Sequence, residues 1–306
     1  MTLSIKRIRN FIAIANAGQV SQAAMELNAS QSAVTTALQQ LEAELGVKLF
    51  TRRSSGMSLT AEGARFLQHA RNIMAAVNEA VSSPLKDDAG LAGRLRVGVT
   101  YTVAGYFMPR HHARFLRSFP RIGLELVELP RDAIEVGLVD RTLDIAVMLV
   151  SNLSNRRQLA HETLVHSRRR LWLPVEHPLL GKETITLEDV AREPYVMLTV
   201  DEAAKTASRY WRGSGLEPKP MFTTSSVEAV RSMVAAGMGV TILSDMVYRP
   251  WSLEGQRIET RPVVGDIPTM EVGLAWNRRQ AQAPTVKAFH DFMTMTFNGA
   301  GASVGH

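Results

Sequence analysis

The sequence predicts a chain of three parts: a small helical N-terminal domain, one long helix, and a two-lobed α/β region. Over residues 4–60, apolar residues recur at helical spacing and short turn signals separate the segments. One uninterrupted apolar stripe follows over residues 61–83. From Arg94 onward, short apolar strands alternate with amphipathic helices, as they do in α/β folds. The length of 306 residues is that of about two domains.

Composition limits the classes of protein that the chain can belong to. Hydrophobic residues make up 45% and charged residues 21%, as in ordinary soluble globular proteins. No stretch is long and apolar enough to span a bilayer, and the start, MTLSIKRIRNF, lacks an apolar signal core. We therefore expect no export, no membrane partner and a cytoplasmic location. The absence of cysteine excludes disulfides, thiolate metal sites and cysteine nucleophiles.

Val20–Leu41 reads as two short helices joined by a tight turn. The first helix covers Val20–Leu27, and Asn28 can leave it in the left-handed conformation. Ser30 can cap the second helix. This order predicts a helix-turn-helix within an N-terminal domain of residues 1–60.

The second of these helices has one polar and one apolar half. At about 100° per residue, the apolar half contains Ala33, Val34, Ala37, Leu38 and Leu41. The polar half carries no charge: Gln31, Ser32, Thr35, Thr36, Gln39 and Gln40. Amides and hydroxyls are the groups that pair with base edges in a DNA major groove. The alternative is a solvated helix that happens to lack Lys and Glu.

A short hairpin, or wing, is predicted in the following segment, KLFTRRSSGMSLT. Arg52 and Arg53 stand where DNA phosphates would lie beside the helix. Residues 1–60 carry six basic and three acidic side chains, which is half of the chain's net charge of +6. That charge and a pI near 9.8 suit a polyanionic partner. A solvated arginine pair is the alternative.

Residues 61–90 are expected to form a linker. Thr60 can cap a helix that ends near Ser83, before Pro84 and the polar segment LKDDAGLAG. Its apolar stripe contains Phe66, Ala70, Ile73, Met74, Val77 and Val81. Such a stripe favours pairing with a second copy of the chain; packing on the rest of the same chain is the alternative.

Residues 91–300 are expected to form two mixed-sheet lobes. Lobe I would contain about residues 91–160 and 265–300, because the last strand and helix can return to it, and lobe II residues 161–264. A ligand would bind between the lobes, at the carboxyl ends of the strands. Hydroxyl groups directly follow strands or precede a helix there: Thr100, Tyr101, Thr102, Thr199, Thr224 and Ser225. Hydroxyls at a helix start suit an anion, whereas Asp201 favours an amine.

The sequence resembles the LysR-type transcriptional regulators over nearly its whole length. The phrases SQ-x-AV, LE-x-x-LG-x-x-LF-x-R and LT-x-x-G occur between Ser30 and Gly63. Weaker similarities are LRVGV at Leu95, RFLRSFP at Arg114, LDIAV at Leu143, HPL at His177 and AAGMGVTIL at Ala235. Two departures are Thr36, where many members carry an arginine that reaches the DNA, and Asp140, where glycine is usual.

The resemblance implies an N-terminal winged helix-turn-helix, a linker helix and a periplasmic-binding-protein-like effector domain. It implies a sequence-specific regulator without catalytic residues, metal or cofactor. Its partners would be an inverted-repeat DNA operator, a small organic effector, further copies of itself in a dimer or tetramer, and RNA polymerase. The resemblance assigns DNA contacts to Gln31, Ser32, Thr35, Thr36, Gln39, Arg52 and Arg53.

An enzyme or a small-molecule receptor with an accessory helical domain is the alternative class. His111 and His112 are neighbours in a predicted helix and point about 100° apart, so they do not share a target. HPL at His177 reads as a loop. No phosphate-binding loop of the G-x-x-x-x-G-K-[ST] type occurs. A receptor would not need the first ninety residues.

Overall fold

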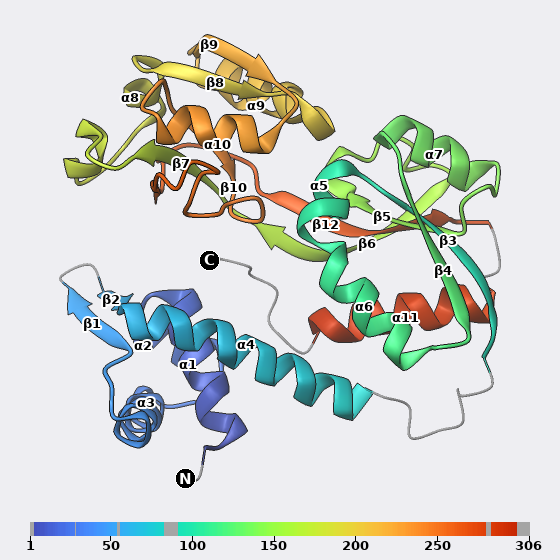
Figure 1. Cartoon of the computed structure of the whole chain (residues 1–306), viewed down its shortest axis with the longest axis horizontal. Helices are drawn as coiled ribbons and strands as arrows, with labels where there is room; N and C mark the ends of the chain where they lie inside the picture. Colours follow the sequence, from blue (N-terminus) through green and yellow to red (C-terminus); the bar gives the residue numbers. More distant parts are fainter. Residues whose placement is uncertain (1–2, 28, 54–55, 83–90, 280–282, 299–306) are drawn as a thin grey trace. The chain divides into compact units, whose positions relative to one another are not determined.

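The computed structural model describes residues 3–27, 29–53, 56–82, 91–279 and 283–298 (Figure 1). These residues fall into two compact units, residues 3–82 with 292–298 and residues 91–291. Asn28, the centre of the expected hairpin turn and the expected linker at 83–90 lie outside the described residues. No helix within the described ranges is both long and apolar enough to cross a membrane.

The first unit has the predicted order of elements. These are α1 (Ile5–Ala17), α2 (Val20–Glu26), α3 (Gln31–Leu45), β1 (Phe50–Arg53), β2 (Gly56–Leu59) and α4 (Ala61–Ser82). The hydroxyls of Ser4 and Ser30 accept the N–H groups of Arg7 and Ala33, at 3.3 Å and 3.2 Å. The Thr60 hydroxyl accepts the N–H of Gly63 at 2.9 Å. Side-chain caps therefore fix where α1, α3 and α4 begin, and the caps at Ser30 and Thr60 were predicted from the sequence.

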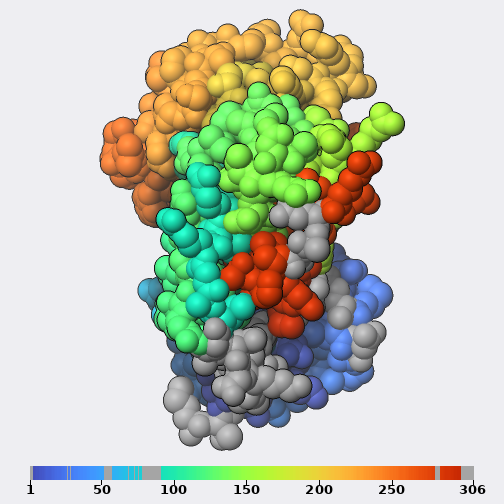
Figure 2. Space-filling model, turned by 90° about the vertical axis from the view of Figure 1, so that its right-hand side faces the viewer, coloured from blue at the N-terminus to red at the C-terminus, as the bar shows by residue number. Residues whose placement is uncertain are grey.

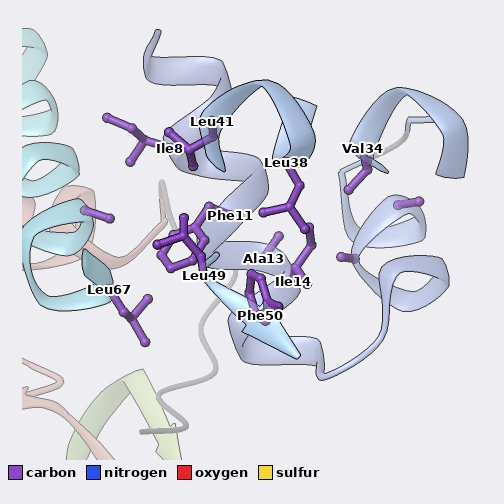
Figure 3. Close-up of a cluster of buried hydrophobic side chains, with 13 residues drawn as sticks. Ile8, Phe11, Ala13, Ile14, Val34, Leu38, Leu41, Leu49, Phe50 and Leu67 are labelled. Carbon is purple, nitrogen blue, oxygen red and sulfur yellow. The ribbon is translucent and has the colours of Figure 1, made fainter. Parts of the chain in front are cut away.

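Phe11 lies at the centre of the core of this unit (Figure 3). Its side chain is fully buried, and its ring centroid lies 5.4 Å from that of Phe50 and 5.1 Å from that of Phe66. Around it pack the apolar faces of α1 and α3 and the first half of α4, including Ile8, Ile14, Val34, Leu38, Leu41, Leu67 and Ala70. One core thus holds the helix-turn-helix, the hairpin and the start of the long helix together.

Part of the apolar stripe of α4 packs within the first unit. Leu67 and Ala70 are buried in the first unit's core, and Phe66, Ile73 and Met74 pack against it. This part of the stripe contacts its own chain, which was the alternative interpretation, and pairing of the helix with a second copy stays a prediction. Periodicity identified the apolar face of the helix but contains no information about which surface covers that face.

Lobe I of the second unit contains a five-stranded mixed sheet in the order β4-β3-β5-β12-β6. The strands are β3 (Gly93–Val99), β4 (Ile122–Glu128), β5 (Ile145–Leu149), β6 (Leu159–Ser167) and β12 (Met270–Asn277). β12 lies between β5 and β6 and runs antiparallel to both, so the last strand returns to lobe I. Because β6 belongs to this sheet, the expected lobe boundary near residue 160 moves to the residues after Ser167.

The helices of lobe I are α5 (Tyr101–Tyr106), α6 (Met108–Ser118), α7 (Arg131–Val139) and the part of α11 (Pro284–Asn298) that belongs to the second unit, residues 284–291. The pattern of residues 106–118 indicates one helix that begins at Tyr106, and the structure places a second helix, α5, before it. Its six residues directly follow β3 after Thr100. A helix of that length is too short to show a 3.6-residue period.

Lobe II contains a three-stranded sheet, β10-β7-β11, and the parallel pair β8-β9. The strands are β7 (Arg169–Pro174), β8 (Pro194–Leu198), β9 (Lys219–Thr224), β10 (Thr241–Ser244) and β11 (Ile258–Arg261). The helices are α8 (Leu187–Ala191), α9 (Ala203–Gly213) and α10 (Val227–Ala235), with 3-10 turns η3 (Pro178–Gly181) and η4 (Val200–Glu202). Figure 2 shows the yellow and orange residues of lobe II packed directly against the green residues of lobe I.

Candidate nucleic-acid interface and ligand cleft

The predicted reading face of α3 lies at the surface of the first unit. Gln31, Ser32, Thr36 and Gln39 are exposed, and Thr35 is half-buried. On the opposite half, Val34, Leu38 and Leu41 are buried, whereas Ala33 is exposed. Ala33 lies in the first turn of the helix. The surface that remains is uncharged and rich in amides and hydroxyls.

Two hydroxyls of this face bond within the chain. The Thr35 hydroxyl donates to the carbonyl oxygen of Gln31 at 2.8 Å. The hydroxyls of Ser30 and Ser32 lie 3.1 Å apart. Since a hydroxyl has one donor and two acceptor positions, Thr35 keeps lone pairs and its methyl group for an approaching base.

Glu42 is a site residue that the sequence analysis missed. Its carboxylate is 7% exposed, and Oε1 accepts the N–H groups of Leu49 at 2.8 Å and Phe50 at 3.3 Å. Lys48 Nζ pairs with Oε2 at 2.7 Å. Burial raises the pKa of Glu42, but these three hydrogen bonds outweigh burial and lower its pKa below the ordinary value. One carboxylate at the end of α3 thus fixes the start of the hairpin.

The hairpin positions the two arginines through its backbone register. Arg52 lies opposite Met57, and Arg53 lies opposite Gly56; their side chains are outside the described residues. Two other basic residues of the unit form ion pairs: Arg7 pairs with Glu44 at 2.6 Å, and Lys48 pairs with Glu42. Lys6 and Arg9 are exposed. Within the described part of the unit, Lys6 and Arg9 have no ion pair.

A cavity of about 470 Å³ lies between the two lobes of the second unit. Thr100 and Tyr101 line it, as predicted. Thr102 does not line it and is buried; its N–H donates to Asp201 Oδ2 at 2.7 Å. Further lining residues from lobe I are Glu128, Leu129, Pro130, Arg131, Asp132, Met148, Leu149 and Asn152, and from lobe II Val200, Asp201, Glu202 and Lys205.

The other three predicted effector residues do not line this cavity. The Thr199 hydroxyl donates to the carbonyl oxygen of Thr224 at 3.2 Å, which joins β8 to β9. The Thr224 hydroxyl accepts the N–H of Ser226, and Ser226, not Ser225, caps α10. Ser225 is exposed. The hydroxyls of Thr199 and Thr224 thus bond to backbone groups of their own lobe, as hydroxyls at turns and helix starts commonly do.

Three contacts join lobe I to lobe II at the cavity. Besides the Thr102–Asp201 bond, Asn152 Nδ2 donates to the carbonyl oxygen of Asp201 at 2.9 Å. Arg131 Nε lies 3.1 Å from Glu202 Oε1, while Arg131 Nη1 lies 2.8 Å from Glu135 Oε1. Asp201 and Glu202 adopt positive φ angles of 49° and 62°. Successive residues in the left-handed region are strained, and these contacts hold them in place.

The sequence analysis missed the residues that follow β4. The strand-end rule that selected Thr100 and Tyr101 after β3 applies equally to Glu128–Asp132, because β3 and β4 are parallel neighbours. Because the prediction considered only hydroxyl-bearing residues at strand ends, it did not include Glu128, Arg131 and Asp132. Asn152 and Glu202 carried no comparable signal, since their positions depend on the packing of the two lobes.

The histidine pair at 111–112 does not form a catalytic site. His111 is 1% exposed, and its Nε2 accepts from Arg110 Nε at 3.1 Å. Burial, together with Arg110 and Arg114, lowers the pKa of His111 to about 3. His177 begins a 3-10 turn, where its Nδ1 accepts the N–H of Leu179. Across the described ranges, no three His, Asp or Glu side chains are grouped closely enough to hold a metal ion.

Acid should destabilise the second unit through His111. Its pKa is about 3 in the folded chain and 6.5 when unperturbed, so only the unfolded chain gains this proton between those values. Lowering the pH through that window should reduce the free energy of unfolding by up to about 1.4 kcal/mol per pH unit. Urea unfolding at a series of pH values measures the slope, which His111→Gln should flatten.

Protonation of Asp245 should oppose the acid destabilisation caused by His111 over part of this pH range. Burial raises its pKa from 3.8 to about 6, against the opposing effect of Arg170 and Arg168. The folded chain therefore binds a proton between pH 6 and 3.8 that the unfolded chain does not, which stabilises it as the pH falls. Asp245→Asn should consequently make the free energy of unfolding fall more steeply as the pH is lowered. An unchanged slope in both variants would contradict the assignment.

Comparison with known proteins covers both units. Residues 5–64 match the model of the bacterial regulatory helix-turn-helix protein, lysR family, and residues 88–298 match the LysR substrate binding domain. The Uncharacterized HTH-type transcriptional regulator YnfL of Escherichia coli (strain K12) is 27% identical over 301 residues, covering 94% of this chain and 97% of that protein.

Solved structures share the fold over the whole chain. HinK, a LysR family transcriptional regulator from Pseudomonas aeruginosa, has a TM-score of 0.63 at 24% identity and covers 97% of this chain and 99% of its own. Full-length CbnR in complex with its target DNA has a TM-score of 0.55 at 22% identity, with 96% and 99% covered. At these identities the likeness establishes the architecture.

Proposed function

This chain belongs to the LysR family of bacterial transcriptional regulators, and on that premise we propose that it binds an inverted-repeat operator as a dimer through the exposed face of α3. It is a DNA-binding regulator with an effector-binding domain, and regulators of this family are not enzymes. RNA polymerase is its further partner and the cytoplasm its location in this proposal, because a regulator acts on transcription where the DNA lies.

The observation that carries the proposal is the uncharged surface of α3. Gln31, Ser32, Thr35, Thr36 and Gln39 lie at the surface over a helix whose other half is buried in the core. A recognition helix presents such a face to base edges in the major groove. Thr36 supplies a hydroxyl and a methyl group where many relatives have an arginine, so contacts at that position would read a base edge or a thymine methyl group.

Dimeric binding fixes the operator geometry and the salt dependence. Two-fold symmetry predicts half-sites about 34 Å apart, or a multiple of this spacing. Arg52 and Arg53 in the hairpin contact phosphates in this proposal, and the exposed Lys6 and Arg9 are further candidates for phosphate contacts. Three to four phosphate contacts per subunit predict a slope of about −5 to −7 in a plot of log affinity against log salt concentration.

Thr35→Ala and Arg53→Ala should weaken DNA binding in different ways. Loss of the Thr35 hydroxyl and methyl group removes a base contact, so discrimination against operators with one altered base pair should fall by about tenfold. Loss of Arg53 removes a phosphate contact, so all sequences should weaken equally and the salt slope should drop by about two per dimer. Gel-shift titrations with a set of singly altered operators measure both quantities.

Ala64→Ser is the matched control, because Ala64 is an exposed alanine of α4 and lies on a different helix from the proposed reading face. It should change neither discrimination nor salt slope. If Thr35→Ala and Arg53→Ala have the same effect on every sequence, the division between base reading and phosphate contact is wrong.

The interlobe cavity is the proposed effector site. It is lined from both lobes, and its volume lies in the range of small-molecule sites. A ligand there would change the contacts of Asp201 and Glu202 with lobe I and thereby the balance between lobe arrangements. Only a ligand that prefers one arrangement can shift that balance. Effector binding would then alter how the two reading helices of the dimer meet the operator.

A further inference from the structure

The basic side chains that line the interlobe cavity form ion pairs, whereas most of its acidic side chains do not. Both cations are paired: Arg131 contacts Glu135 and Glu202, and Lys205 Nζ lies 3.2 Å from Glu202 Oε1. The remaining three carboxylates, Glu128, Asp132 and Asp201, have no basic partner among the residues that the structure describes. The cavity therefore has an excess of uncompensated negative charge.

A buried hydroxyl provides a second, independent sign of a ligand. Thr100 lines the same cavity, is 2% exposed, and has no hydrogen-bond partner for Oγ1 within the described structure. A buried polar group left unsatisfied costs about 1–3 kcal/mol, and such groups are rare in folded proteins. A ligand atom bound beside Thr100 would satisfy this hydroxyl.

Asp201 already accepts the backbone N–H group that an anionic ligand in this cavity would otherwise accept. Asp201 Oδ2 accepts the N–H of Thr102 in the first turn of α5, and Asn152 holds the backbone of Asp201. A carboxylate effector would have to displace Asp201 and then lie among like charges, which is unfavourable in a partly buried site. A cation faces neither cost.

We propose that the effector of this cleft is a small organic amine or guanidine, whose cationic group is held by Glu128, Asp132 and Asp201 and donates to the Thr100 hydroxyl. This inference rests on the proposed function, because it assigns a chemical class to the ligand of the same cavity. Glu128 ends β4, Asp132 lies in the first turn of α7, and Asp201 belongs to lobe II. The cation thus contacts both lobes and favours the closed arrangement.

The test compares cationic and anionic probes of equal length on the full chain. Isothermal titration calorimetry is carried out with 1,4-diaminobutane, 1,5-diaminopentane, agmatine and arginine, and with succinate and glutarate. We expect at least one amine to bind and to bind more weakly as salt is added. Glu128→Gln and Asp132→Asn should each weaken that amine about tenfold or more, the loss of one charge-assisted contact.

Asp140→Asn is the matched control. Asp140 is an exposed acid at the other end of α7, outside the cavity, and its replacement removes the same charge from the same helix. It should leave amine binding unchanged. Because Glu128, Asp132 and Asp140 are all exposed, the three variants should fold alike, which circular dichroism checks.

Failure of this inference is distinguishable from failure of the proposed function. If no amine binds, or if amines bind equally to wild type and Asp132→Asn, the assignment of a cationic effector is overturned. If succinate or glutarate binds, and binds more tightly to Asp132→Asn, the cleft is an effector site for anions. If an amine binds as expected but leaves operator affinity and footprint unchanged, the cation site stands and its role as the effector site is overturned.

Discussion

Glu42→Ala should lower the free energy of unfolding of the first unit by about 3 kcal/mol and reduce operator binding with it. The substitution removes a carboxylate that is 7% exposed and leaves the N–H groups of Leu49 and Phe50 without their acceptor. Buried donors without a partner are costly, and Lys48 loses its ion pair at the same time. Hydrogen exchange at the Leu49 and Phe50 amides, together with urea unfolding, measures the loss.

The effect should extend to DNA because the hairpin is fixed through these bonds. Leu49 and Phe50 lead directly into the strand that carries Arg52 and Arg53. Without the carboxylate, the hairpin should lose its fixed position relative to α3, so every operator sequence should bind more weakly. Glu42→Gln keeps one acceptor oxygen and should lose less.

Glu62→Ala is the control for the loss of one acid in the same unit. The Glu62 side chain is 43% exposed and pairs with Arg65 on the surface of α4. Exposed pairs of this kind contribute about 0.5 kcal/mol. If Glu42→Ala destabilises the unit no more than Glu62→Ala does, the bonds to the hairpin are not what stabilises it.

Gly63→Ala should also destabilise the first unit strongly, by about 3 kcal/mol. A Cβ atom at this position would lie 2.0 Å from the carbonyl oxygen of Leu49 and 2.9 Å from its carbonyl carbon. Both are backbone atoms, so a side-chain rotation cannot relieve the clash. The first turn of α4 would have to move away from the hairpin, and the bonds that Thr60 makes to Lys48 and Leu49 would be strained.

Gly105→Ala is the matched control for this substitution. It makes the same change in another helix, α5, where an added Cβ would meet no atom within 4 Å. Alanine is the better helix former, so Gly105→Ala should be neutral or slightly stabilising. Thermal unfolding followed by near-ultraviolet absorbance of the aromatic core compares the two. Equal stability of both variants would show that α4 can start farther from the hairpin than the structure places it.

Local patterns predicted most of the elements of the first unit. The caps at Ser4, Ser30 and Thr60 and the glycines at 18 and 46 each specify a helix end through a bond or a backbone angle that their own residue supplies. The polar face of α3 follows from helical periodicity. Glu42 was missed because its bonds go to residues seven and eight positions away, a distance that no helical or strand period reports.

In the second unit, the order of strands and helices was predictable from the sequence. The residues that line the interlobe cavity were predictable only in part. Thr100 and Tyr101 were found because they directly follow a buried strand. Thr199, Thr224 and Ser225 obeyed a similar rule, but the hydroxyls of Thr199 and Thr224 bond to nearby backbone groups and Ser225 is exposed. The pattern of residues 201–211 indicates a helix that begins at Asp201, whereas Asp201 and Glu202 adopt left-handed angles held by contacts from the other lobe.

By itself, the sequence determined the family, the three-part architecture and the uncharged surface of α3, because these follow from residue type and spacing along one element. The tertiary structure alone decided where the stripe of α4 packs, which strand-end residues share the cavity, and which carboxylates there remain unpaired. Those outcomes depend on contacts between residues far apart in the chain, where burial and charge pairing act between elements and leave no period in the sequence.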